Sequence, residues 1–259
     1  LHFGKAPKKS GKILLTFDDA MSCHYEYVFP ELMERGLWGN FYVPTLPYAT
    51  NKILDVHRIH LLCGRFDGTE LLNLASSLIS ADMIPDARKE SFQKHTYTRQ
   101  QNYAGVTEFK KIMNYFISYK FRAGIIDEIA RRLNYVFKAD TFYVAFDSLS
   151  EMSSSGMVIG CHTHSHPVMS KLDAAEQLLE LESSFSLLKK FDEPGFITYC
   201  HPYGGAQSFN ATTISILDKM NIDYSFMVDP RDITVSDIGS RKHQLPRYDC
   251  NSFPFGTAS

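Results

Sequence analysis

Residues 12–43 read KILLTFDDAMSCHYEYVFPELMERGLWGNFYV and contain the pattern that decides the fold. Lys12 to Phe17 form a short apolar, strand-like run that ends in two aspartates, and Gly39 to Val43 form a second such run. Between them, Tyr25 to Arg35 has helical spacing and stops at Gly36, where a C-terminal helix cap is expected. The stretch is therefore predicted to be a βαβ unit with two parallel strands.

The same alternation continues in the second half of the chain. Further strand-like runs, most of them separated by helix-like segments, are Thr141–Phe146, Met157–Cys161, Phe196–Cys200, Tyr224–Val228 and Gln244–Tyr248. Short apolar strands that alternate with helices predict a parallel sheet covered by helices, open or closed into a barrel. Residues from about 47 to 140 break this alternation with helix-like segments around a polar middle at Ser91 to Asn102. We therefore predict one α/β domain over residues 1–259, with a helical insertion after the second strand.

Length and composition narrow the classes of function. The chain has 259 residues, which suits a single α/β barrel domain, and its formal net charge of -2 gives no reason to expect nucleic acid as a partner. No apolar run approaches the roughly 18 to 20 residues that span a bilayer, so no transmembrane segment is expected. The five cysteines include no CxxC pair and indicate reduced thiols. This favours the cytoplasm, and export with a trimmed leader is the alternative.

Asp18 and Asp19 directly follow an apolar strand. Paired carboxylates are costly at such a place unless they bind a cation or share hydrogen bonds. Because adjacent residues point in different directions, one carboxylate can bind a metal ion while its neighbour faces a water molecule. The alternative is an ordinary turn or a helix N-cap, where aspartate is also favoured.

Three histidines lie within GCHTHSHP, residues 160–167, again just past a short apolar strand. If this segment turns helically, His162 and His166 fall on one face at a spacing suited to two imidazoles on one metal ion, and His164 points elsewhere. A purely structural metal site is the alternative. Only two ligands are local, however, so a third from a distant segment would leave an open coordination position, as in catalytic sites.

A third segment, YCHPYGG at residues 199–205, also ends a predicted strand. Pro202 and the glycines predict a tight turn that presents backbone N–H groups, which can stabilise an oxyanion. An ordinary Pro-Gly turn is the alternative.

Together and in this order, the three segments resemble the polysaccharide deacetylase family, also called carbohydrate esterase family four or the NodB homology domain. TFDDA matches its first motif, HTHSHP its second motif, and HPYG the Pro-Tyr-Gly part of its third. The resemblance covers roughly residues 10 to 45 and 140 to 250. It implies a distorted (β/α)7 barrel that removes acetyl groups from N-acetylated sugars with zinc or a similar divalent ion.

The resemblance also implies roles for individual residues. Asp19, His162 and His166 become the ligands of a divalent metal ion, with Zn2+ expected, and Asp18 becomes the base that takes a proton from the attacking water. The backbone N–H of Tyr203 helps to hold the oxyanion. The implied substrate is an acetylated sugar or polysaccharide, and the residues expected to contact it are His201, Pro202, Tyr203 and His57.

Two departures from the family pattern concern the third and last motifs. Cys200 stands where many members have an arginine, and the leucine-flanked histidine that supplies the general acid in many members has no clear counterpart. His243 lies in a Lys/Arg-rich run and is expected to be exposed. Of His57 and His60, which share one face of a predicted helix, one could replace the missing acid; core packing is the alternative. The insertion is expected to cover the site.

Arg247 is predicted to take over the role of the missing arginine. It lies in the last apolar run, QLPRY, where it could hydrogen-bond Asp18 in a bidentate manner and keep its pKa low. Asp249, two residues on, could hold the arginine in turn. The alternative is a surface ion pair between Arg247 and Asp249.

Three other functions are compatible with parts of the pattern. The same metal site could hydrolyse a cyclic imide or ring amide, or the chain could be an inactive carbohydrate-binding relative. Asp18 argues against the inactive relative, because metal binding needs no free carboxylate beside the ligand. A thiol hydrolase using Cys161 or Cys200 is the third alternative, although a cysteine beside a metal-binding histidine is usually a small core residue.

Overall fold

The computed structural model describes residues 12–85, 102–139, 141–191 and 195–253. The chain divides into two compact units, one formed by residues 1–50 and 140–259 and the other by residues 51–139. Each unit contains a hydrophobic cluster of its own. The polar middle predicted at Ser91 to Asn102 lies, except for Asn102, outside the described residues.

The first unit is built on one parallel sheet of six strands in the described part of the chain, and neighbouring strands follow chain order. The strands are β1 (Leu15–Asp18), β2 (Gly39–Val43), β3 (Val158–Cys161), β4 (Thr198–Cys200), β5 (Tyr224–Val228) and β6 (Leu245–Arg247). Arg247 of β6 donates a hydrogen bond to Thr16 Oγ1 of β1 at 3.1 Å, so the sheet curls and its two end strands face each other. The result is a half-barrel, which confirms the predicted α/β barrel class.

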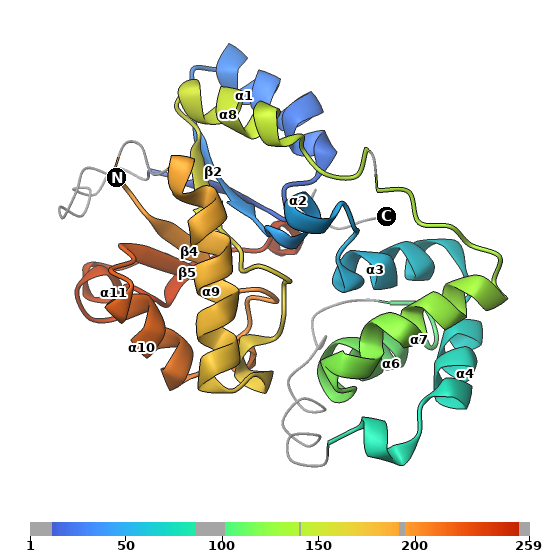
Figure 1. Ribbon diagram of the computed structural model, residues 1–259. Coiled ribbons are helices and arrows are strands. Elements are labelled where there is room, and N and C mark those ends of the chain that lie inside the picture. The colour runs from blue at the N-terminus through green and yellow to red at the C-terminus, as the bar shows by residue number, and fades with distance from the viewer. Residues whose placement is uncertain (1–11, 86–101, 140, 192–194, 254–259) are drawn as a thin grey trace. The chain divides into compact units, whose positions relative to one another are not determined.

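Helices connect the strands and cover the outer face of this sheet (Figure 1). They are α1 (Phe29–Glu34), α2 (Leu46–Thr50), α8 (Phe146–Ser154), α9 (Ala174–Leu188), α10 (Ala211–Lys219) and α11 (Val235–Ser240), with a π-helical turn at His24–Val28 before α1. Short 3-10 turns are formed by Met169–Lys171, Lys189–Phe191, Ala206–Ser208 and Cys250–Ser252. The helical connections serve as the crossovers that parallel strands need, because a tight hairpin can join only antiparallel strands.

The two faces of the sheet have different contents, since side chains alternate along each strand. Phe41, Ile159 and Met227 pack with the helices in a large outer cluster. Tyr42 and Phe226 belong to a small inner cluster with Cys200 and Leu245. Gly160 makes room for the inner Tyr42, because a Cβ atom at this position would lie 2.6 Å from the tyrosine ring. The inner side is thus filled below the carboxyl ends of the strands, where Asp18 and Arg247 lie.

The strand predicted at Thr141 to Phe146 does not form. Tyr143 makes only an isolated antiparallel bridge with Met21, and α8 begins at Phe146. Backbone hydrogen bonds from Val144 N–H to Ala20 O (2.8 Å) and from Ser22 N–H to Phe142 O (3.0 Å) tie the segment to the chain just after β1. The apolar run is therefore a connector that returns from the second unit, and six strands replace the expected seven in the described residues.

The second unit is helical, as the sequence predicts. Its elements are α3 (Asp55–Arg65), α4 (Gly68–Leu78), a 3-10 turn (Ala81–Met83), α6 (Val106–Lys111), a π-helical turn (Ile112–Phe116) and α7 (Tyr119–Arg132). His57 of α3 is 4% exposed, and its predicted contact with substrate stays a prediction. That the unit is an insertion in a single domain, and that it covers the site, stay predictions.

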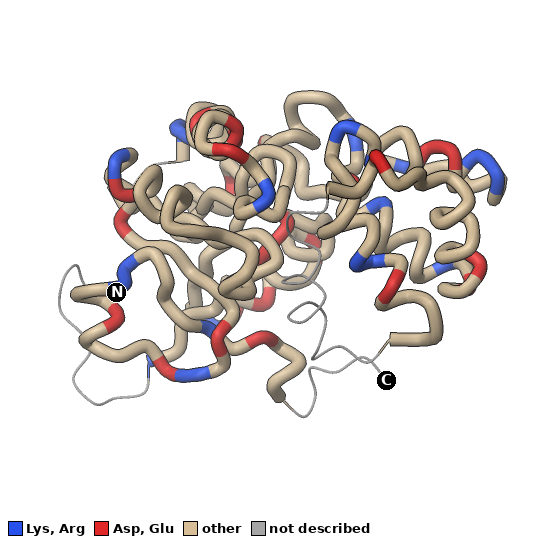
Figure 2. Tube along the Cα trace, turned by 90° about the horizontal axis from the view of Figure 1, so that it is seen from below, with Lys and Arg blue, Asp and Glu red and all other residues tan. Residues whose placement is uncertain are grey.

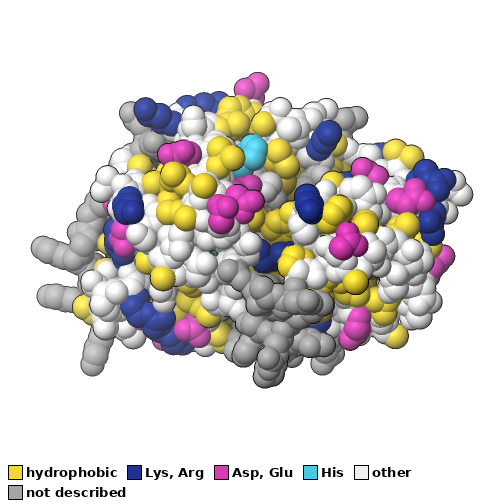
Figure 3. Space-filling model, turned by 60° about the horizontal axis from the view of Figure 1, so that its bottom comes forward, with side chains coloured by type: hydrophobic (Ala, Val, Ile, Leu, Met, Phe, Trp, Pro, Cys, Tyr) yellow, Lys and Arg dark blue, Asp and Glu magenta, His cyan; other side chains and the backbone are white. Residues whose placement is uncertain are grey.

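Lys and Arg residues and Asp and Glu residues are distributed along the whole of the drawn trace (Figure 2). On the face drawn in Figure 3, Lys and Arg side chains lie near Asp and Glu side chains and between apolar groups. None of the helices in the described part of the chain has the length and hydrophobicity needed to cross a bilayer.

Candidate metal centre

The end of β1 turns its two aspartates in different directions. Asp18 closes the strand, and Asp19 follows with a φ of 77°, in the left-handed region that aspartate tolerates better than most residues. Asp18 consequently faces Arg247, whereas Asp19 faces His162 and His166. The arrangement is the one expected if the two carboxylates have separate tasks.

The histidine segment is an irregular loop, so the predicted helical turn is wrong. Thr163 and His166 have φ values of 66° and 56°, and this loop nevertheless brings the rings of His162 and His166 to a centroid distance of 4.7 Å. His162 Nδ1 lies 2.8 Å from the backbone carbonyl of Cys200. Because a carbonyl only accepts, Nδ1 carries the proton, and Nε2 presents its lone pair to Asp19.

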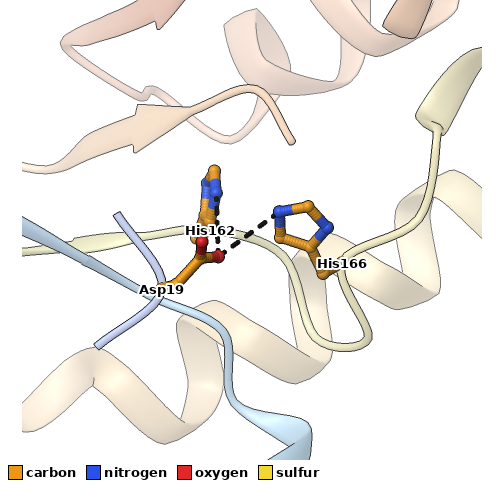
Figure 4. Close-up of side chains that lie close together, drawn as sticks. All are labelled: Asp19, His162 and His166. Carbon is orange, nitrogen blue, oxygen red and sulfur yellow. Dashed lines mark ion pairs between the residues drawn. The ribbon is translucent and has the colours of Figure 1, made fainter. Parts of the chain in front are cut away.

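Asp19, His162 and His166 form a group that could hold a metal ion (Figure 4). Asp19 Oδ1 lies 3.6 Å from His162 Nε2 and 3.4 Å from His166 Nε2. Three donors at about 2 Å from one tetrahedral ion lie about 3.3 Å apart, so these separations suit zinc. Two imidazole nitrogens and a carboxylate oxygen are also a donor set that zinc favours. The residues therefore fit the divalent ion that the motifs imply.

Arg247 reaches Asp18 with both terminal nitrogens of its guanidinium. Nη1 donates to Asp18 Oδ1 at 2.8 Å, and Nη2 donates to Oδ2. Burial raises the pKa of Asp18, but the charge and hydrogen bonds of Arg247 together with the nearby His162 outweigh this, so the pKa of the carboxyl lies below its usual value. With 26% of its side chain exposed, the carboxylate stays accessible to water. The structure thus places Arg247 as the sequence predicts, and it keeps Asp18 ionised and oriented.

Of the residues near this ion pair, Cys200 contacts Asp18, whereas Asp249 does not make the predicted contact with Arg247. Cys200 Sγ lies 3.7 Å from Asp18 Oδ2. That Arg247 replaces the arginine missing from position 200 stays a prediction. Asp249 does not hold Arg247. It accepts hydrogen bonds from the backbone N–H and the side chain of Asn251, at 3.1 and 3.0 Å, because the chain turns into a 3-10 helix after β6.

Replacing Arg247 by lysine tests the orienting role. Lysine keeps the positive charge but loses the planar fork, so we expect kcat/KM to fall about 10- to 100-fold while the protein stays folded. Arg131→Lys is the matched control, because Arg131 makes a bidentate contact with Glu128 at an exposed position in the second unit. A parent rate in Arg247→Lys would show that the guanidinium does not orient the base.

The third motif places its residues in two environments. Tyr203, with a φ of 62°, lies with its ring 5.0 Å from the His166 ring, so the turn borders the metal group. Pro202 is buried in the same turn. His201 is 1% exposed, and its ring stacks on Phe209 at a centroid distance of 3.8 Å. The prediction that the His201 side chain contacts substrate is therefore not supported by its position, because the ring is part of the packed interior.

His243 is also buried, which corrects the expectation that it is exposed. It is 2% exposed; Nδ1 lies 2.9 Å from Ser225 Oγ, and Nε2 lies 3.0 Å from Asp218 Oδ1. Its backbone carbonyl accepts a hydrogen bond from His201 Nε2 at 2.8 Å. The Lys/Arg-rich run around it misled the interpretation, since these partners come from segments about 20 residues earlier in the chain.

Buried His201 makes the stability of the fold sensitive to acid. Burial lowers the pKa of His201 to about 3, whereas the unfolded chain has the ordinary value near 6.5. The unfolded state therefore binds more protons between these values, and stability falls as the pH decreases through this range. At pH 4 the loss from this residue is about 3 kcal/mol.

The measurement is urea unfolding of metal-free protein at pH 7 and pH 4, for the parent and for His201→Gln. Glutamine can still donate to the His243 carbonyl but does not titrate, so the variant should lose less stability on acidification. Equal losses in both proteins would contradict the assignment.

The sequence interpretation missed two residues that contact the histidine loop. Glu180 of α9 accepts hydrogen bonds from its backbone, and Thr45, just after β2, binds the His164 ring. A glutamate on an amphipathic helix carries no signal of such a contact, because its partners are backbone groups of another segment.

Comparisons with known proteins agree with this geometry. The family model for polysaccharide deacetylase matches residues 127–225, which include the second and third motifs. No curated protein matches the sequence significantly. The fold is similar to that of the Streptococcus pyogenes deacetylase PplD in complex with acetate, with a TM-score of 0.53 and 15% identity over 95% of this chain and 67% of that chain.

Two further solved structures align at lower TM-scores. One is IcaB from Ammonifex degensii, with a TM-score of 0.46 and 17% identity over 92% of this chain and 68% of that chain. The other is the BpsB deacetylase domain from Bordetella bronchiseptica, with a TM-score of 0.44 and 14% identity over 91% of this chain and 70% of that chain. The family match over residues 127–225 confirms the resemblance to polysaccharide deacetylases that the motifs indicate, and the chain shares the fold of PplD.

Proposed function

We propose that this protein is a metal-dependent hydrolase that removes the N-acetyl group from a carbohydrate, with Asp19, His162 and His166 holding a divalent ion, expected to be zinc. The observation that carries the proposal is the pairing of two carboxylates at one strand end. Asp19 lies with the two imidazoles, and Asp18 lies against Arg247. A metal-dependent binding module would need the group of Asp19 with the two histidines, but it would not need a second carboxylate held by an arginine.

The residues of the chain have separate roles in the proposed reaction. Asp18, held ionised by Arg247, accepts the proton of the water that attacks the acetyl carbonyl. A divalent ion held by Asp19, His162 and His166 would supply Lewis-acid polarisation of that carbonyl and of the water. The backbone N–H of Tyr203, a residue whose ring lies 5.0 Å from the His166 ring, would stabilise the negative charge on the carbonyl oxygen. The C–N bond then breaks as the leaving nitrogen takes up the proton that Asp18 received from water, which gives acetate and a free amine.

The experiment is acetate release from N-acetylated oligosaccharides by protein loaded with zinc or cobalt, with metal-free protein as the blank. We expect turnover that depends on the added ion and disappears with a chelator. A panel of cyclic imides and ring amides, tested with the same preparation, distinguishes substrate classes. Turnover only on that panel, or sugar binding without any acetate release, would contradict the proposed function.

A further inference from the structure

The loop between His162 and His166 has an unfavourable backbone that its surroundings must maintain. Thr163 and His166 both lie at positive φ, at 66° and 56°, although neither is a glycine. Such residues persist where neighbouring contacts fix them. Within the loop, Thr163 Oγ1 accepts from His166 N–H at 3.0 Å and donates to the His162 carbonyl at 2.5 Å. These local bonds fold the loop, but they do not attach it to the rest of the unit.

Glu180 attaches the loop to α9. Its Oε2 accepts hydrogen bonds from the backbone N–H groups of His164 and Ser165, at 3.0 and 2.8 Å. Its Oε1 accepts from Ser165 Oγ at 2.5 Å. One carboxylate thus receives three hydrogen bonds from two successive residues at the middle of the loop. Bonds to an ionised acceptor are stronger than neutral ones, so this is a firm attachment.

Thr45 holds the same loop from the β2 side. Its Oγ1 lies 2.9 Å from His164 Nδ1, and its backbone N–H donates to the Thr163 carbonyl at 3.2 Å. Leu46 N–H donates to the His164 carbonyl at 2.9 Å. Thr45 is fully buried, so water does not compete for these bonds. His164 is therefore fixed from both sides, although it is not one of the three residues that could hold the ion.

We propose that Glu180 and Thr45 are positioning residues of the metal centre: they hold the strained loop in the one conformation that directs His162 and His166 toward Asp19, and so set the affinity for the divalent ion. The inference rests on the proposed function of the Asp19, His162 and His166 group. Neither positioning residue belongs to the group that could hold the ion. Their contribution is the preorganisation of two ligands, as for other groups that orient metal ligands from behind.

The test measures the dissociation constant of zinc by competition with a chromophoric chelator, on protein first stripped of metal. Glu180→Gln should bind zinc about 10- to 100-fold more weakly, because a neutral amide lacks the negative charge that strengthens these hydrogen bonds, and its NH2 group cannot accept from Ser165 Oγ. Glu182→Gln is the matched control, since Glu182 lies exposed on the same helix. It should bind zinc like the parent.

A second readout separates positioning from simple destabilisation. Activity of Glu180→Gln on acetylated oligosaccharide should return toward the parent kcat at saturating zinc, with KM unchanged. If Glu180→Gln does not fold, Ser165→Ala and Thr45→Val each remove one contact and should each weaken zinc binding several-fold. Parent-like zinc affinity in the folded variants overturns the inference. The proposed function would instead be overturned if His162→Ala and His166→Ala bound zinc as tightly as the parent protein does.

Discussion

Asp18→Asn is expected to lower kcat/KM by about 10²- to 10⁴-fold while the protein still binds its metal ion. Asparagine has nearly the same size as aspartate but cannot accept a proton at neutral pH. It also loses one acceptor for Arg247, whose two terminal nitrogens both bind the carboxylate. The loss should therefore appear in turnover, because the ligand atoms of Asp19, His162 and His166 are untouched.

To isolate this effect, steady-state acetate release and metal content are measured for the parent protein and for Asp18→Asn. Asp249→Asn is the control, since Asp249 lies on the segment after Arg247 but binds only its own turn in the described hydrogen bonds. The thermal midpoint of both variants should be recorded, because removal of a partner from a partly buried ion pair also costs stability. An Asp18→Asn protein that turns over substrate at the parent rate would exclude Asp18 as the base.

Alanine at Asp19, His162 or His166 is expected to abolish metal binding and activity together. Each residue supplies one of the three donor atoms, which all lie within 4.8 Å of one another. Loss of one donor leaves two, too few to hold a zinc ion firmly in a site that normally uses three protein ligands. Metal content after dialysis, measured by atomic absorption, gives a result that does not depend on the choice of substrate.

Paired asparagine variants decide between the two aspartates. Asp19→Asn should lose the ion, whereas Asp18→Asn should retain it. If instead Asp18→Asn released the metal and Asp19→Asn kept it, the two roles would have to be exchanged. The two carboxylates face different partners, so the two variants should differ in metal binding. A general disturbance of the turn would instead affect metal binding in both variants alike.

Much of the fold was predictable because its signals are local. The run from Lys12 to Val43 predicts a strand, a helix and a parallel strand, and the structure has β1, α1 and β2 there. The run from Thr141 to Phe146 has the same apolar character, yet it pairs only through Tyr143. Apolar composition indicates burial but not the partner, and here the partner is the segment after β1.

The environments of the histidines could not be predicted from the residues next to them in the sequence. The spacing of His162 and His166 identified them as a pair, although the turn that brings them together is irregular and not helical. For His243 the Lys/Arg-rich neighbours indicated exposure, and for His201 the family resemblance indicated contact with substrate. Both are buried by contacts with segments distant in the sequence, such as Phe209 for His201 and Ser225 for His243.

The sequence by itself determined the parallel α/β architecture, the strand ends that carry Asp18, Asp19 and the two histidines, and the candidate arginine at position 247. These follow from periodicity and from residue types that are costly to bury without a partner. Only the tertiary structure decided which carboxylate faces which partner, the tautomer of His162 and the attachment of the histidine loop to Glu180. Such contacts join backbone and side-chain groups across long sequence separations, and their formation depends on how the sheet curls and where each helix packs.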